Sequence, residues 1–285
     1  MKDIPVRKLQ SSCSSIRPNE QFRLIQLEDH LKEEEFVHDT HRPDFYFLLF
    51  FESGSGEHIV DFRPFTLTPS TVFVLRPGQV HSLTINEQSK GYIIQFNSDL
   101  FDSGELTNVQ LLKKLSRSAF LAFSSEAFTK LSSLLHSIAI ELANKEKDFH
   151  KSIRAYVELL LIELNRKYPR TQKDGVSSFE LNTFDTISNL LDAHVLEHKR
   201  VSDYAQMMNL STFQLNKITK TVQGKTFSEV LNERKILESK RFLQATSVQI
   251  KEIAFKLGYD DVSYFSRYFK KHTGMTPVEF RRNFK

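Results

Sequence analysis

The last third of the chain carries the same residue pattern twice. The two copies lie 49 and then 50 residues apart, and corresponding positions hold comparable side chains. In order, these positions are Ala205, Asn209, Leu215, Lys217 and Gly224 in the first copy and Ala254, Gly258, Phe265, Arg267 and Gly274 in the second. Such a repeat indicates one supersecondary unit that occurs twice, which limits this region to a pair of similar helical units.

Each copy has the residues expected of a helix-turn-helix unit. An alanine within the first helix allows the second helix to approach closely, and Asn209 or Gly258, four residues later, supplies a left-handed turn. We expect side-chain caps at the four helix starts, from Ser202 and Ser247 for the first helices and from Ser211 and either Asp260 or Asp261 for the second. Residues 227–243, between the copies, are expected to form one continuous helix.

The second helix of each unit has one apolar face and one polar or basic face, with Lys217 and Arg267 at the same position. An ordinary helical hairpin with a solvated face would explain a single copy. Two copies with a basic residue at the same place favour a nucleic-acid surface. The long helix between them would hold the units at a fixed separation, as reading two successive major grooves ~34 Å apart requires.

The net charge is concentrated in the same region. From residue 180 onward, 17 Lys and Arg face 12 Asp and Glu, a net charge of +5, whereas residues 1–179 carry 22 against 23, a net charge of −1. Positive charge suits a partner rich in phosphate, because each neutralised phosphate releases a condensed counterion. Together with the repeat, the charge predicts double-stranded DNA as a partner.

Several other classes of protein are excluded or disfavoured by the sequence. The longest unbroken apolar stretch, residues 45–51, is far shorter than the ~20 residues that cross a bilayer. The amino terminus lacks the apolar segment of a secretion signal, so we expect a cytoplasmic protein with no membrane partner. Cys13 is the only cysteine, which excludes an intrachain disulfide and a cysteine-based metal centre.

Residues 20–100 have the pattern of short strands separated by turns. Glycine and proline breaks separate apolar segments at 45–51, 58–62, 71–75, 82–85 and 92–96. Short strands at this regular spacing predict an antiparallel barrel or sandwich. Its interior is expected to be filled by Phe45, Phe47, Phe73 and Phe96.

A helical hairpin is predicted after these strands. Ile153, Val157, Leu160 and Leu164 line one face of its second helix, which Pro169 ends, and the polar residues 169–180 have the composition of a linker. The first helix has two interpretations that the sequence leaves open. It covers the barrel, or it is a dimerisation element that contacts a second chain through Leu131, Leu135, Ile138 and Leu142.

Residues 258–281, GYDDVSYFSRYFKKHTGMTPVEFR, resemble the signature of the AraC/XylS family of bacterial transcription regulators, and residues 201–240 resemble the unit that precedes it. The resemblance implies that the second helix of each unit enters the major groove. It implies that DNA is contacted by Phe213, Gln214, Asn216 and Lys217 in the first unit and by Ser263, Tyr264, Ser266 and Arg267 in the second. Lys220 and Lys270, further along these helices, are expected to meet phosphate.

Residues 69–86, PSTVFVLRPGQVHSLTIN, are similar to the second motif of the cupin fold, including Pro77, Gly78, His81 and Asn86. The first cupin motif fits badly, because His41 stands alone where paired histidines and a following glutamate are usual. His38, His41, His58 and His81 could still come together in three dimensions. Without the glutamate, we predict hydrogen-bonded histidines, no metal and no cofactor.

The sequence thus predicts an α+β multidomain chain. Residues 1–168 would form a cupin-like antiparallel β-barrel with a helical hairpin at about 125–168, residues 169–180 a linker, and residues 181–285 an all-α domain of two helix-turn-helix units joined by a long helix.

The leading functional hypothesis is a homodimeric, sequence-specific transcription regulator with no catalytic residues. A small effector would bind in the barrel, and RNA polymerase would be a further partner of an activator. The alternative is a cupin-type metal enzyme with a helical appendage, and a third hypothesis keeps DNA binding but gives the barrel a role in assembly alone. Neither the effector, the operator nor the direction of regulation can be read from the residues.

Overall fold

A computed structural model describes residues 6–7, 9, 22–31, 36–101, 106–118, 120–168, 176–198 and 200–283. The chain divides into two compact units, one within residues 5–169 and the other within 170–285. Cys13 and residues 169–175 of the predicted linker lie outside the described residues. The domain limits given above stay predictions.

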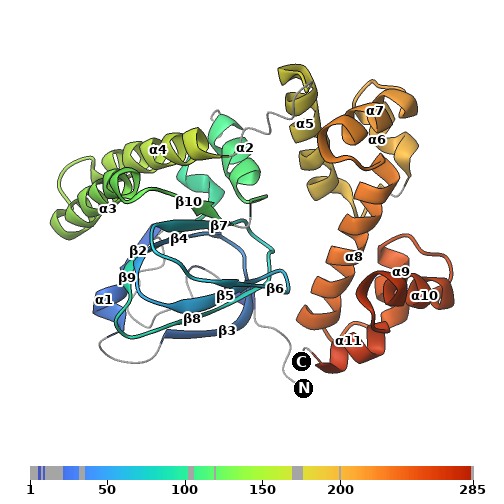
Figure 1. The fold of residues 1–285 in the computed structure, drawn as a ribbon, viewed down its shortest axis with the longest axis horizontal. Helices are drawn as coiled ribbons and strands as arrows, with labels where there is room; N and C mark the ends of the chain where they lie inside the picture. Colours follow the sequence, from blue (N-terminus) through green and yellow to red (C-terminus); the bar gives the residue numbers. More distant parts are fainter. Residues whose placement is uncertain are drawn as a thin grey trace. The chain divides into compact units, whose positions relative to one another are not determined.

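The first unit contains two five-stranded sheets that face each other (Figure 1). One sheet consists, in spatial order, of β1 (Val6–Arg7), β3 (Phe36–Pro43), β8 (His81–Ile85), β5 (Gly56–Val60) and β6 (Arg63–Thr66). The other consists of β10 (Leu121–Ala122), β7 (Thr71–Leu75), β4 (Tyr46–Ser53), β9 (Lys90–Phe96) and β2 (Phe22–Gln26). Pairing between the described strands is antiparallel apart from that of β1 with β3. The predicted antiparallel cupin-like barrel is confirmed.

The sheet that contains β4 is buried on both faces. Phe47 and Phe51 pack between the two sheets, whereas Leu48 and Phe50 pack on the opposite face against helices. Burial on both faces explains why residues 45–51 form one continuous apolar run rather than an alternating strand. The expectation that Phe96 lines the interior is wrong, because register places its side chain on the helix-covered face.

Helices cover the outer face of this sheet (Figure 1). They are α2 (Leu106–Leu115), α3 (Ser125–Asn144) and α4 (Phe149–Lys167); the short elements α1 (Leu27–His30) and a 3-10 turn at Ser98–Leu100 complete the unit. An ion pair of 2.6 Å between Lys130 Nζ and Glu163 Oε1 joins α3 to α4.

The apolar stripe of α3 packs inside its own chain. Leu131, Leu135 and Ile138 are fully buried among residues of α4 and the sheet, and Leu142 is half-buried at the edge of the same core. These side chains cover the barrel, which is one of the two interpretations left open by the sequence. In this structure the three fully buried ones are not on a surface that a second chain could contact.

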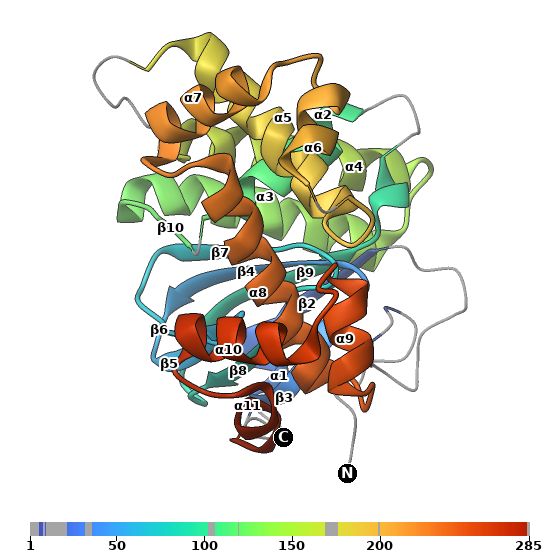
Figure 2. The ribbon, with the colours of Figure 1, turned by 90° about the vertical axis from the view of Figure 1, so that its right-hand side faces the viewer.

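The second unit consists of helices. They are α5 (Ser178–His194), α6 (Val201–Met207), α7 (Thr212–Gln223), α8 (Phe227–Ala245), α9 (Ile250–Lys256), α10 (Val262–Thr273) and α11 (Pro277–Asn283). Figure 2 shows α8 passing from the pair α6–α7 to the pair α9–α10. Asn209 and Gly258 have φ angles of 51° and 82°, so the predicted left-handed turns are present. In the part of the chain that is described, no helix has both the length and the apolar character to cross a membrane.

Two of the four expected helix caps are wrong. Ser211 and Asp261 cap α7 and α10 as predicted. Helix α6 instead begins after Arg200, whose backbone N–H donates to Asp203, so Ser202 lies within the first turn. Helix α9 begins after Gln249 rather than at Ser247. The Asp203 carboxylate accepts a hydrogen bond from the Arg200 N–H, which is one half of a capping box, whereas a serine cap would accept one from the first turn.

Candidate nucleic-acid interface

Helix α7 is fixed by its own ends and by its apolar face. The Ser211 hydroxyl accepts a 3.2 Å hydrogen bond from the Gln214 N–H, while Gln214 Oε1 accepts one of 2.8 Å from the Ser211 N–H. This reciprocal capping box satisfies two N–H groups of the first turn. Leu215, Ile218 and Val222 are buried on the inner face, which leaves the other face of α7 to solvent.

The outer face of α7 presents one large apolar side chain and two lysines. Phe213 is 76% exposed, and Lys217 and Lys220 are exposed without forming a hydrogen bond or ion pair to any described residue. Among the described residues, Phe213 is the most exposed of the large apolar side chains.

Asn216 lies at the edge of this face and its amide is occupied. Its Nδ2 donates to the Thr212 carbonyl at 2.9 Å, and its Oδ1 accepts from the Phe227 N–H at 3.0 Å. Asn216 therefore braces α7 against the start of α8, and its role as a base-reading residue conflicts with these bonds. Gln214 is partly occupied too, since its Oε1 belongs to the capping box.

Helix α10 begins differently. Asp261 accepts hydrogen bonds from the N–H groups of Ser263 (2.5 Å) and Tyr264 (3.1 Å). These backbone N–H groups hold the pKa of the Asp261 carboxyl below its usual range. The amino terminus of α10 therefore carries a fixed negative charge, whereas that of α7 is capped by a neutral hydroxyl.

The outer face of α10 presents polar, aromatic and basic groups. Ser263, Arg267 and Lys270 are exposed and Tyr264 is 52% exposed. Tyr264 stacks on Tyr268 with ring centroids 6.1 Å apart, so the exposed ring is held in place from below. Ser266 corresponds to Asn216, and its hydroxyl likewise donates within its own helix, to the Val262 carbonyl at 2.9 Å. The exposed basic residue Lys271 adds to the charge of this helix.

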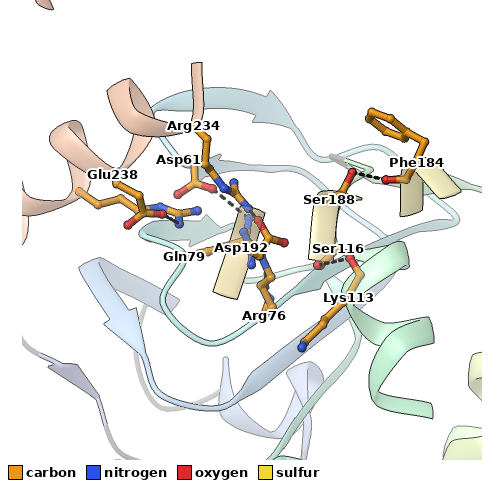
Figure 3. A network of polar contacts seen from close by, with 11 residues as sticks. Asp61, Arg76, Gln79, Lys113, Ser116, Phe184, Ser188, Asp192, Arg234 and Glu238 are labelled. Atoms are coloured by element: carbon orange, nitrogen blue, oxygen red, sulfur yellow. Dashed lines mark hydrogen bonds and ion pairs between the residues drawn. The ribbon is translucent and has the colours of Figure 1, made fainter. Parts of the chain in front are cut away.

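Charged side chains attach α8 to the helices that flank the two helix-turn-helix units. Arg234 forms an ion pair with Asp192 of α5 on the side of the first unit, and Figure 3 shows the two groups pointing toward one another. At the other end, Arg281 of α11 donates to the carbonyls of Leu243 (3.2 Å) and Val248 (2.6 Å). These contacts fix α5 and α11 to α8, which also packs against α7 and α9, so both units are attached to one helix.

The barrel contains a buried cluster of three histidines from β3, β5 and β8. His41, His58 and His81 are all at least 99% buried, and His58 Nε2 lies 3.0 Å from His81 Nδ1. Burial, with a smaller effect of His41, lowers the pKa of His58 to about 3, so its ring is neutral at neutral pH. Nδ1 of His58 is buried without a hydrogen-bond partner. The side chain of His38 lies outside the described residues.

A second group of possible metal ligands was missed by the sequence reasoning. Among the described residues, His194, Glu197 and His198 each have a possible ligand atom within 4.8 Å of those of the other two. The three barrel histidines do not meet this criterion. The spacing of one helical turn between these residues, H-x-x-E-H, was the sequence signal that could have found it.

Two exposed recognition helices, each backed by a first helix and both attached to one long helix, define a double helix-turn-helix DNA-binding protein, here joined to a two-sheet barrel. The chain matches the family described as a helix-turn-helix domain over residues 204–283 and the AraC-like ligand binding domain over residues 29–156. It belongs to the AraC/XylS family of transcription regulators.

Its relatives include the HTH-type transcriptional activator RhaR of Mannheimia succiniciproducens, 21% identical over 249 residues that cover 86% of this chain and 87% of that protein. The Xylose operon regulatory protein of Haemophilus influenzae is 36% identical over 95 residues, 32% of this chain and 24% of its own. Among solved structures, ToxT from Vibrio cholerae aligns over 93% of this chain and 98% of its own, with 18% identity and a TM-score of 0.43.

Proposed function

We propose that α7 and α10 insert into two successive major grooves of one operator and divide the contacts between them. Lys217 and Arg267 occupy equivalent exposed positions on helices fixed to a common support, and this symmetry carries the proposal. Phe213, Lys217 and Lys220 would act in the first groove, and Ser263, Tyr264, Arg267 and Lys270 in the second. Asn216, Ser266 and Gln214 would contact DNA only through the donors and acceptors that their internal bonds leave over, such as Nε2 of Gln214.

Selection of operators from random duplex DNA by the purified protein tests this proposal. Two conserved half-sites about 10–10.5 base pairs apart centre to centre are expected, because that is one helical turn. In a matched selection, Lys217→Ala should lose base preference in one half-site alone. Arg267→Ala should lose base preference in the other half-site alone. Loss from both half-sites in either variant contradicts the division of contacts.

We infer that the barrel is where a small effector is sensed. The support is the buried Nδ1 of His58, which has no hydrogen-bond partner, since a buried polar atom left unpaired costs about 1–3 kcal/mol that a ligand's polar group could recover. A panel of sugars and small carboxylic acids can be screened by thermal shift of the full chain. A hit that His58→Phe abolishes, with His150→Phe on α4 as the exposed control, supports this site; a hit that persists in His58→Phe contradicts it.

We also propose that the regulator is a homodimer, through the outer face of the helical hairpin rather than through its buried stripe. Ile140 of α3 and Leu159 and Ile162 of α4 are 45–47% exposed. Leu159→Glu with Ile162→Glu should give a folded monomer by sedimentation velocity. In contrast, Leu135→Asp is expected to unfold the first unit, because it places a charge in a closed core. A monomeric wild-type chain at high micromolar concentration contradicts the dimer.

The remaining parts of the proposal follow from the family and from the named relative. We propose a cytoplasmic activator that contacts RNA polymerase and performs no catalysis. A promoter fusion that rises with expression of the chain and stays flat with the Lys217→Ala, Arg267→Ala double variant supports activation. A signal that falls on expression of the wild-type chain indicates a repressor.

A further inference from the structure

The carboxyl end of helix α5 brings two imidazoles and one carboxylate together. His194 is the last residue of α5, and Glu197 and His198 follow in the next turn. His194 Nδ1 lies 3.1 Å from Glu197 Oε2, and the ring centroids of His194 and His198 are 5.5 Å apart. One possible ligand atom from each residue lies within 4.8 Å of the other two.

We propose that His194, Glu197 and His198 bind one divalent transition-metal ion of the Zn²⁺ type. Two imidazoles and a carboxylate are a donor set that Zn²⁺ takes in proteins, with a fourth position left for water. With metal–ligand bonds of about 2.0–2.2 Å, the ligand atoms of a tetrahedral site are about 3.3–3.6 Å apart. The 3.1 Å separation of His194 Nδ1 from Glu197 Oε2 is close to that value, whereas ligand atoms up to 4.8 Å apart would approach by side-chain rotation.

The backbone already holds the three residues in place. The N–H groups of Glu197 and His198 both donate to the His194 carbonyl, at 3.0 and 2.8 Å, which closes the turn that carries the ligands. The end of a helix also favours a cation, because its last carbonyl groups give it a partial negative charge. Both histidines are half-buried and Glu197 is exposed, so an ion reaches the site from solvent.

The site is linked to the first helix-turn-helix unit. The Tyr204 hydroxyl of α6 donates to the His198 carbonyl at 3.1 Å, and the Tyr204 ring packs 5.2 Å from that of Phe227 at the start of α8. A bound ion would therefore fix the turn between α5 and α6 against the helix that supports both recognition helices. Metal binding would make the first helix-turn-helix unit more rigid. This effect would be the same whichever DNA sequence the protein binds.

Metal content is the decisive measurement. The full chain, stripped with a chelator and dialysed against Zn²⁺, is expected to bind one ion that His194→Ala and His198→Ala remove. His136→Ala, an exposed histidine on α3, is the matched control and should leave the content unchanged. Glu197→Gln keeps the size of the side chain and is expected to lower the affinity for Zn²⁺ by at least about 10-fold. Changes of residues that only hydrogen-bond to metal ligands already cost about that much.

Co²⁺ supplies a second readout, because a tetrahedral site with nitrogen and oxygen ligands gives intense visible absorption bands. These bands should appear in the wild-type chain and His136→Ala but not in His194→Ala or His198→Ala, with unchanged circular dichroism in all four. Equal metal content and equal Co²⁺ spectra in wild-type and the two ligand variants would overturn the site, as would a wild-type chain that binds no metal. Metal that remains in both ligand variants belongs to another site, such as the barrel histidines. The proposal is then decided by whether the wild-type chain binds more metal than the two variants.

Discussion

Helices α7 and α10 occupy equivalent places in the two helix-turn-helix units, yet their surfaces differ in chemistry. Helix α7 is capped by the neutral Ser211 and exposes Phe213 with two lysines, whereas α10 is capped by the ionised Asp261 and exposes Tyr264 with Arg267. A negative cap repels the phosphate that a helix amino terminus otherwise attracts. We therefore expect the first unit to depend more on apolar contacts and the second more on hydrogen bonds to base edges.

The interiors of the two units differ as well. The inner face of α7 is aliphatic with Leu215, Ile218 and Val222, whereas that of α10 uses Phe265 and Phe269, and Phe269 meets Phe280 of α11 edge to face at 5.5 Å. One backbone motif is thus supported by two kinds of core. The repeat therefore fixes the path of the chain and leaves both the packing and the DNA surface free to differ.

The largest effect is expected from the cores. Phe265→Ala should lower the free energy of unfolding by about 3–5 kcal/mol and Leu215→Ala by about 2–5 kcal/mol, because both side chains are fully buried. Urea denaturation measures these losses, and footprinting should show each variant losing protection of its own half-site first. Simultaneous loss of both half-sites in each variant would mean that the two units do not fold separately around α8.

Arg267→Ala is expected to lose ~1–3 kcal/mol of binding at the cognate site and to relax the preference at one base pair. The guanidinium can donate to O6 and N7 of a guanine together, which a smaller side chain cannot replace. Affinities for a panel of single-base operator variants at fixed salt test this. A uniform loss across the panel would show that Arg267 positions the protein rather than reads a base.

Phe213→Ala should weaken binding by up to about 1.5–3 kcal/mol if the ring covers a thymine methyl group, because the whole ring then loses its contact. An operator with deoxyuridine in place of thymine should weaken the wild-type protein by ~0.8 kcal/mol, the value of one buried carbon group, and leave Phe213→Ala unchanged. Additive losses would place Phe213 away from a thymine. Tyr264→Phe is the control, because it keeps the apolar area of the other unit.

Lys220→Ala and Lys270→Ala should weaken specific and random DNA about equally. Each is expected to reduce the slope of log affinity against log salt by ~0.9, because one phosphate contact is lost. Fluorescence anisotropy over a series of salt concentrations gives the slope. A variant that changes the preference among operators without changing the slope has lost a base contact instead.

The smallest effect is expected from exchanging the caps. Asp261→Ser keeps a side-chain acceptor at the start of α10 but removes its charge, so affinity for random DNA should rise slightly at low salt. The reverse change, Ser211→Asp, should lower it. Helix content by circular dichroism must stay constant in both, and if neither variant changes the affinity, the caps lie away from the phosphates.

The sequence was sufficient for the features that depend on local residue types. Asn209, Gly258 and the caps Ser211 and Asp261 are set by neighbours a few residues away, and the helix that starts at Phe227 was expected from its own pattern. The barrel followed from strand spacing, although β2, β3 and β6 were not predicted because their residues alternate weakly. The assignment of the individual DNA-contacting residues stays a prediction.

Other features needed the tertiary structure, because they depend on residues distant in the chain. Periodicity identified the apolar stripe of Leu131, Leu135 and Ile138, but only packing against the sheet decided that it faces inward. Asn216 has the side chain of a base reader, yet the Phe227 N–H, eleven residues later, occupies its oxygen. Likewise His41, His58 and His81 come from three strands and meet only when the sheet forms, since strand register rather than sequence spacing sets which side chains share an interior.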